Sequence, residues 1–202
     1  MVLVAKALAG TSAALSRRAL VKLQAQTQAM VRCLNCPGGP CIESLYVHSP
    51  TWCPLSLTIH RDMGVMLTTN GHMQKLNRKF RKMDKPTDIL SFPFHKIRAP
   101  GRFPRVKRKE ERYLGDIYIS PAYIQAQCED PQLDDVTTLE ERLPVLMAHG
   151  LCHLMGYDHE QDADYEHMQQ AENFILNRYA QFLPPAFATD NTSIPATDTD
   201  LM

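Results

Sequence analysis

Apolar and polar positions form short runs that predict strands and helices along much of the chain. Four runs alternate or stay apolar as strands do, at residues 55–60, 64–69, 87–94 and 114–120. Helical spacing, with apolar residues three or four positions apart, marks stretches that begin near residues 70, 121, 138 and 162. The folded body is therefore predicted to run from about residue 55 to residue 183.

The ends of the predicted helices carry residues that usually begin and end helices. Asn70 suits the N-cap of the first helix. Thr138 and Glu141 have the spacing of a capping box for the third helix, which Gly156 would end. Pro144 lies inside that third stretch, so the helix is expected either to kink there or to start there.

Residues 1–54 differ from the predicted body in composition. The first acidic residue is Glu43, and five basic residues come before it: Lys6, Arg17, Arg18, Lys22 and Arg32. A basic segment without acidic residues is typical of an organellar transit segment, which predicts a mitochondrial location, with chloroplast or cytoplasm as alternatives. The same stretch fits a second interpretation, a first strand at residues 2–5 followed by a helix of the domain. The apolar residues that share one face of that helix are Leu20, Leu23, Met30 and Leu34.

A loose series of cysteines precedes the predicted body: Cys33, Cys36, Cys41 and Cys53, with His48 between the last two. The spacing matches none of the common zinc-ligand patterns, so we expect free thiols in an insertion and leave a metal or disulfide role undecided. Cys128 and Cys152 fall in predicted helices, where thiols usually pack as small apolar groups. Residues 184–202 are rich in Thr, Asp and Pro and are predicted to be a disordered tail.

Composition narrows the class of protein and charge suggests a partner. The chain has 202 residues, 44% of them apolar and 22% charged, with no run of 18 apolar residues. We therefore expect a globular chain without a transmembrane helix. Residues 71–112 contain 14 Lys and Arg against four acids, a balance of +10, and residues 113–202 contain two against 16, a balance of −14. The basic part predicts a surface for a polyanion, with a solvated basic loop at residues 98–112 as the alternative.

Three histidines near the end of the third predicted helix suggest a metal site. His149 and His153 are one helical turn apart, so both rings project from one face within reach of a single ion. Gly156 lets the chain leave the helix through a left-handed turn, after which His159 can fold back as a third ligand. Three neutral nitrogens with an open fourth position are typical of a catalytic zinc site, and we predict one zinc ion there.

The spacing H-x-x-x-H-x-x-G-x-x-H equals that of the metzincin peptidases, with one difference. Those enzymes carry a glutamate after the first histidine, and this chain carries Gly150. Because that glutamate is the base that activates zinc-bound water, peptide hydrolysis by this route would lack its proton acceptor. The pattern favours a metal site and disfavours a peptidase.

Four motifs in this order closely resemble the YbeY endoribonuclease family. They are L-N-R-K-F-R at 76–81, D-K-P-T-D-I-L-S-F-P-F at 84–94, L-G-D-I at 114–117 and H-G-L-C-H-L-M-G-Y-D-H at 149–159. The resemblance covers roughly residues 64–180. It implies an α+β fold related to the zincins, with a small mixed sheet packed with helices and a three-histidine zinc site at a helix end. It also implies a single-strand-specific endoribonuclease that acts in ribosomal RNA maturation and ribosome quality control.

The resemblance also implies roles for individual residues. By motif position, His149, His153 and His159 are the zinc ligands and Arg81 is the functional arginine. A guanidinium can place two donors on one phosphate, so Arg81 would hold the scissile group. Nearby basic side chains are expected to contact flanking phosphates. They are Lys79, Lys82, Lys85, Arg105, Lys107 and Arg108.

Other polar residues near the motifs have supporting roles at most, and no general base is identifiable. Asp158 is expected to orient a ligand histidine or to cap a turn, and Asp116 to bond backbone or a histidine that supports the ligands. Thr87 and Ser91 are expected to be ordinary strand hydroxyls, with a place in the cleft as the alternative.

The expected partners are single-stranded RNA, ribosomal RNA in particular, and a protein of the small ribosomal subunit, with no membrane. Two other functions stay open. One is a non-catalytic ribosome assembly factor in which zinc braces the fold. The other is a zinc peptidase, which Gly150 disfavours.

Overall fold

A computed structural model describes residues 62–101, 103, 108–130 and 138–182, together with residues 22, 25–26 and 29–30 and the backbone of residues 5–7. Several predictions fall outside these residues. They concern the strand at 55–60, the cysteines at 33, 36, 41 and 53, Arg105, Lys107 and the tail at 184–202.

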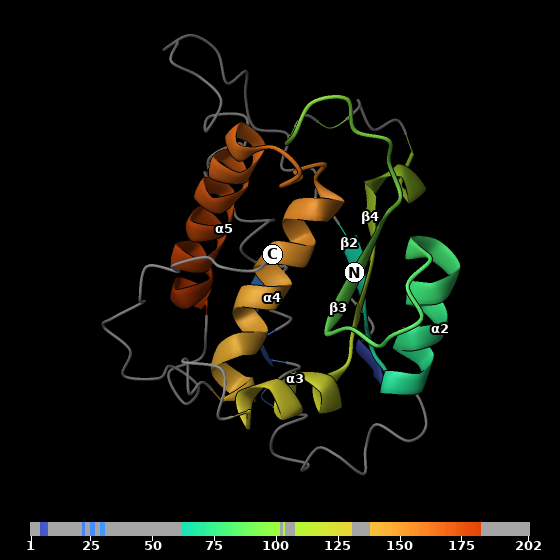
Figure 1. Cartoon of the computed structure of the whole chain (residues 1–202). Helices are drawn as coiled ribbons and strands as arrows, with labels where there is room; N and C mark the ends of the chain where they lie inside the picture. Colours follow the sequence, from blue (N-terminus) through green and yellow to red (C-terminus); the bar gives the residue numbers. More distant parts are fainter. Residues whose placement is uncertain are drawn as a thin grey trace, which may run out of the picture.

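A mixed four-stranded sheet lies at the centre of the described structure (Figure 1). Its strands, in spatial order, are β1 (Ala5–Ala7), β2 (Asp62–Leu67), β4 (Tyr113–Ile119) and β3 (Ile89–Pro93). β1 pairs parallel with β2, and β2 with β4, whereas β3 pairs antiparallel with β4 and forms one edge. This sheet and its helices confirm the predicted α+β class.

The start of the chain contributes to this sheet. β1 runs beside β2, with Ala5 opposite Val65. The described residues between 22 and 30 are helical, and Ala29 and Met30 among them are buried in the core. These observations favour the interpretation of the segment as a strand and a helix of the domain, with β1 at Ala5–Ala7 rather than at residues 2–5. The organellar location stays a prediction.

Helices cover both faces of the sheet. They are α2 (Asn70–Arg81), α3 (Pro121–Cys128), α4 (Leu139–Leu154) and α5 (Asp162–Phe182), with a 3-10 turn, η2 (Glu110–Arg112), before β4. Phe92 and Tyr118 point to the face that α2 covers, where they contact its rings. Ile89 and Ile117 point to the other face, against α4, and α5 packs on the outside of α4 (Figure 1). The alternation follows from the period of two in a strand.

α2 begins and ends through local hydrogen bonds. Thr69 is its N-cap, since Oγ1 accepts a backbone N–H of the first turn, so the predicted cap Asn70 is instead the first helical residue. Lys82 ends the helix in the left-handed conformation, with φ of 63°. The buried side chain of Asn77 donates to the carbonyl oxygen of Lys85 at 2.8 Å. The chain between α2 and β3 is therefore tied to the end of the helix.

α4 runs through Pro144 without interruption. Its N-terminus has the predicted capping box, in which Thr138 N–H donates to Oε2 of Glu141 at 2.9 Å. Pro144 has no N–H to offer to the carbonyl of Glu140, one turn earlier. That carbonyl accepts instead from Nε2 of Gln26 at 3.0 Å. The alternative of a helix that starts at Pro144 is wrong, because another segment satisfies the freed carbonyl.

The exit from α4 requires glycine. Gly156 has φ of +83°, and a Cβ there would lie 2.8 Å from two carbons of Ile97, so both the conformation and the space exclude other residues.

α5 follows and presents the predicted apolar face to the core. Its buried residues are Met168, Ala171, Ile175 and Tyr179. Among the described helices, none combines the length and apolarity needed to span a bilayer.

Candidate metal centre

Three histidine rings meet where α4 ends. His149 and His153 lie one turn apart on α4, and His159 lies in the loop after Gly156. Their ligand nitrogens all lie within 4.8 Å of one another, and Nε2 of His149 lies 3.1 Å from Nε2 of His153. The structure therefore brings the three predicted ligands together.

The donor set fits a transition metal ion. Two nitrogens bound to a tetrahedral zinc ion at about 2.0–2.1 Å are about 3.4 Å apart, close to the 3.1 Å between the two Nε2 atoms. Imidazole suits zinc and its neighbours, whereas magnesium and calcium prefer oxygen ligands. Within the described ranges, this is the one group of three His, Cys, Asp or Glu residues close enough to share an ion.

Each helical ligand is held through its other ring nitrogen. Nδ1 of His149 lies 2.8 Å from Oε1 of Glu172 on α5, and Nδ1 of His153 lies 3.1 Å from the carbonyl oxygen of Tyr157. Because ionised carboxylates and carbonyls only accept hydrogen bonds, we place the proton of both rings on Nδ1. The Nε2 lone pairs are then free to face an ion.

Glu172 is the residue of this site that the motifs do not reveal. It lies on α5, after the last of the four motifs. The available signal is its position next to Ala171, beside the apolar face of that helix. Glu172 is only 21% exposed, and an acidic residue so placed usually has a partner.

The two aspartates predicted near the ligands form hydrogen bonds with groups other than the histidine rings. Among the described residues, Asp116 accepts a hydrogen bond from the hydroxyl of Tyr113, above Gly64, and not from the backbone or the supporting histidine that were predicted. Burial and this bond raise the pKa of the Tyr113 phenol well above its ordinary range, which keeps it a donor. Asp158 accepts the backbone N–H of His159, the next residue, at 2.8 Å, and its expected role as a turn cap stays a prediction.

The environment of His153 favours the neutral ring that a metal requires. Burial, followed by the neighbouring His149 and His159, lowers the pKa of His153 to about 4. The ring is therefore uncharged at neutral pH. Cys152, next to it in sequence, is fully buried, and burial raises the pKa of its thiol, as expected for a packed cysteine.

Gly150 lies where α4 approaches the sheet most closely. A Cβ at this position would lie 2.8 Å from Cδ1 of Ile89, 3.0 Å from Oγ of Ser91 and 3.2 Å from Cδ1 of Ile117. A side chain would therefore enter the interface between helix and sheet. Ser91 faces this contact, while the hydroxyl of Thr87 donates to Asp88 at 3.1 Å.

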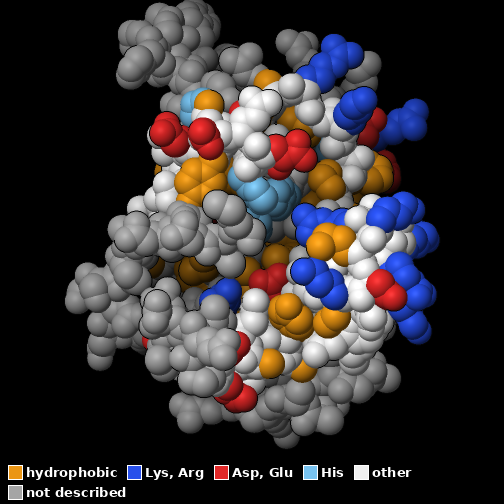
Figure 2. Space-filling view, viewed as in Figure 1, with side chains coloured by type: hydrophobic (Ala, Val, Ile, Leu, Met, Phe, Trp, Pro, Cys, Tyr) orange, Lys and Arg blue, Asp and Glu red, His pale blue; other side chains and the backbone are white. Residues whose placement is uncertain are grey.

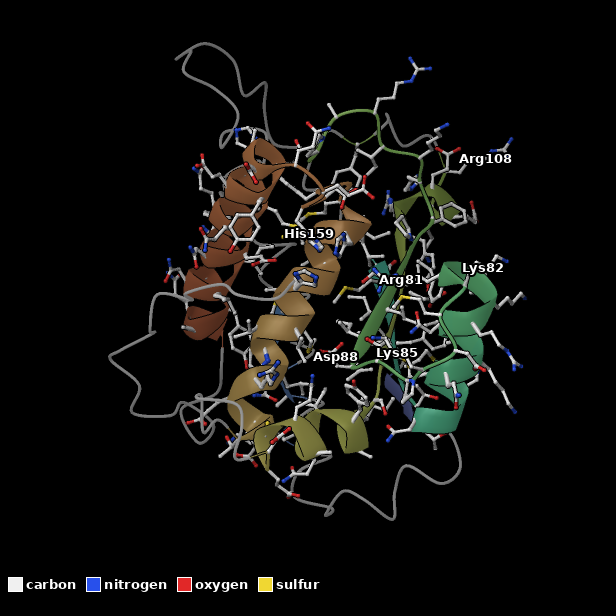
Figure 3. All side chains as sticks on the ribbon, in the orientation of Figure 1. Arg81, Lys82, Lys85, Asp88, Arg108 and His159 are labelled. Atoms are coloured by element: carbon white, nitrogen blue, oxygen red, sulfur yellow. The ribbon has the colours of Figure 1, made fainter. Side chains whose placement is uncertain are left out.

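Basic side chains lie on the same face of the molecule as the histidines. Figure 2 shows the histidines in a hollow with Lys and Arg side chains along one side. Arg81, at the end of α2, is exposed, and Figure 3 shows it over β3, between α2 and His159. Lys79, Lys82 and Lys85 are exposed at the same helix end or just after it, and Arg108 is exposed before η2.

Comparison with known proteins matches residues 51–180 to the family model "Endoribonuclease YbeY". A protein of that name from Homo sapiens is 38% identical over 117 residues, 57% of this chain and 66% of that protein. One from Rhodopseudomonas palustris is 37% identical over 118 residues, 58% of this chain and 56% of that protein. The match thus spans less than two thirds of either relative. A solution structure from Thermotoga maritima aligns at 18% identity with a TM-score of 0.42, over 96% of this chain and 99% of that one.

Proposed function

This chain belongs to the YbeY endoribonuclease family, and on that premise we propose that it is a zinc-dependent endoribonuclease that cleaves single-stranded RNA. The observation that supports this most directly is the convergence of three histidines within 4.8 Å, in a hollow bordered by Lys and Arg side chains. The arrangement of His149 and His153 on one helix also favours the zincin-like relation that the motifs imply.

The residues of the chain would divide the work between positioning and charge. Arg81 would place two donors on the scissile phosphate and offset the charge that develops there. Lys79, Lys82 and Lys85 would hold flanking phosphates without regard to sequence. Glu172 and the Tyr157 carbonyl would keep the ligand rings aligned. A zinc ion at this centre supplies a Lewis acid that polarises a phosphoryl oxygen and lowers the pKa of water.

Cleavage of labelled RNA by metal-loaded protein tests the proposal. We expect a 5′-labelled single strand to be cut, and an Arg81→Ala variant to lose about 10²–10³-fold in rate, the usual cost of removing one transition-state donor. Zinc content by elemental analysis should stay at one per chain in that variant and fall in His153→Ala. Arg78→Ala is the matched control, because Arg78 is exposed on the same helix but lies 3.9 Å from its acidic partner Asp84.

The same experiment addresses the second candidate function, a ribosome assembly factor braced by zinc. That function predicts one zinc ion but equal background cleavage in the wild type and all variants. If the protein is a zinc peptidase, it should cleave casein and leave the RNA intact. Gly150 disfavours the peptidase, since the glutamate base of that pattern is missing and a Cβ there would press on the side chains of Ile89 and Ser91.

We further propose that the substrate is ribosomal RNA, that a small-subunit protein guides the chain to it, and that it works in mitochondria. The acid-poor, basic first 42 residues support import. β1 is a strand of the sheet, so we propose that import does not remove residues 5–7 and that the mature protein keeps them. Organelle fractionation with mass spectrometry of the mature N-terminus tests both points, and a cut after residue 7 would contradict the second.

A further inference from the structure

Phe80 is a large apolar side chain on the last turn of α2 that is 54% exposed. Single exposed apolar residues are common and need no function. Phe80 differs because it directly precedes Arg81 and lies in the most basic part of the chain. Its surroundings therefore bear on what the exposed ring contacts.

Other aromatic rings support Phe80 from the side of the sheet. The Phe92 ring lies 4.9 Å from it at 64°, and the Tyr118 ring lies 5.5 Å from Phe92 at 89°. Edge-to-face pairs of this kind restrain the rings. Phe80 is thus an exposed ring with a neighbouring ring on its sheet side, so stacking on it would cost the Phe80 side chain less rotamer freedom than a fully solvated ring would lose.

A lysine cation lies over the ring, and two more basic residues follow it in the chain. Nζ of Lys79 lies 5.0 Å from the ring centroid, and Arg81 and Lys82 follow directly in sequence. In the described part of the chain, no carboxylate lies within ion-pair distance of Arg81. An exposed aromatic ring beside basic side chains that have no carboxylate partner matches a ligand that is flat and apolar at one end and anionic at the other.

We propose that Phe80 is a stacking platform for one unpaired base of the RNA, next to the phosphate that Arg81 holds. An aromatic face among cations is how many proteins bind single strands. A base inside a duplex is already stacked on both sides and cannot reach the ring without unpairing. The last turn of α2 would then select unpaired RNA, and this inference rests on the proposed nuclease function.

Phe94 provides a matched control within the chain. It is 58% exposed, so truncation removes a similar exposed ring. Its ring contacts His95 and Tyr113. The described residues place no Lys or Arg over it, whereas Lys79 lies over Phe80.

Binding of single-stranded RNA to the metal-loaded full chain tests the platform. A fluorescein-labelled oligomer is titrated by anisotropy, within a time that gives no cleavage on a gel. We expect Phe80→Ala to weaken binding about 5- to 150-fold, which corresponds to the 1–3 kcal/mol typical of one stacked base. Phe80→Trp should restore affinity, Phe80→Leu should not, and Phe94→Ala should change it less than twofold.

A series of oligomers, each lacking one base but keeping its phosphate, locates the stacked base. At one position, loss of the base should weaken the wild type to the level of Phe80→Ala and leave that variant unaffected. Phe80→Leu keeps apolar bulk on the helix, so folding is preserved if the alanine variant unfolds.

The outcomes separate the platform from the nuclease. If the wild type binds and cuts RNA while Phe80→Ala and Phe80→Leu bind every oligomer equally well, the platform is wrong and the nuclease stands. Rescue by leucine, or an equal loss in Phe94→Ala, would show general apolar contact and would overturn stacking. If the wild type neither binds nor cuts RNA, both proposals fail.

Discussion

Removing the carboxylate behind His149 tests whether the protein pre-orients its metal ligands. Glu172→Ala deletes the acceptor 2.8 Å from Nδ1 of His149. The imidazole could then rotate or move its proton to Nε2, and either change removes the lone pair from the metal position. Glu172→Gln keeps an acceptor but loses the charge, and its amide can also present a donor that favours the wrong tautomer. We expect both variants to bind zinc more weakly, the alanine variant more so.

The magnitude follows from the type and exposure of the bond. The side chains are 32% and 21% exposed for His149 and Glu172, so solvent screens the pair only in part. Partners of this kind usually contribute 10- to 100-fold to metal affinity, which is about 1.4–2.7 kcal/mol. We expect about 10-fold for Glu172→Gln and up to about 100-fold for Glu172→Ala.

Competition against a chromophoric zinc chelator at pH 7 measures these affinities. Glu166→Gln is the control, because Glu166 lies on the same helix and is exposed. Circular dichroism of the metal-free proteins checks that α5 is intact. If Glu172→Ala binds zinc within twofold of the wild type and of the control, the hydrogen bond does not orient the ligand and our reasoning is wrong.

Three further predictions concern stability, measured by urea denaturation. In metal-free folded protein the pKa of His153 is lowered to about 4, whereas in the unfolded chain it is about 6.5. Between these values the unfolded chain binds the proton and the folded chain does not. The free energy of unfolding should therefore fall by on the order of 1–3 kcal/mol as the pH drops from 6.5 to 4. A His153→Gln variant should lose most of that slope, and an equal slope would contradict the assignment. Gly150→Ala should cost about 1–3 kcal/mol through overpacking, while Gly71→Ala, with nothing within 4 Å of its Cβ, should be neutral or stabilising by up to about 1 kcal/mol. Thr138→Ala should cost about 1 kcal/mol through loss of the N-cap, and an unchanged midpoint would show that the capping box is not formed in solution.

The features that sequence predicts well are those that depend on local geometry. His149 and His153 are brought together by the helical repeat alone, and Gly156 turns the chain back so that His159 can join them. The capping box of α4 is likewise contained within four residues. Such features need no knowledge of how distant segments pack.

The features that were missed or misplaced depend on contacts across the fold. Glu172 meets His149 only because α5 packs on α4. Pro144 leaves the carbonyl of Glu140 without its helical donor, and Gln26 supplies a donor from a distant segment. No spacing in the sequence reports either contact, since the partners are set by tertiary packing.

Gly150 connects the packing of α4 with the chemistry that the site can perform. Its missing side chain lets the helix lie against Ile89 and Ser91 of the edge strand β3. A glutamate there would bring its Cβ into an interface that also contains Ile117, and its carboxylate would have to be buried or the helix displaced. The peptidase base is thus absent from the sequence, and adding it would require the side-chain ends of Ile89, Ser91 and Ile117 to shift. An added carboxylate would also repel a phosphodiester and so oppose the proposed substrate.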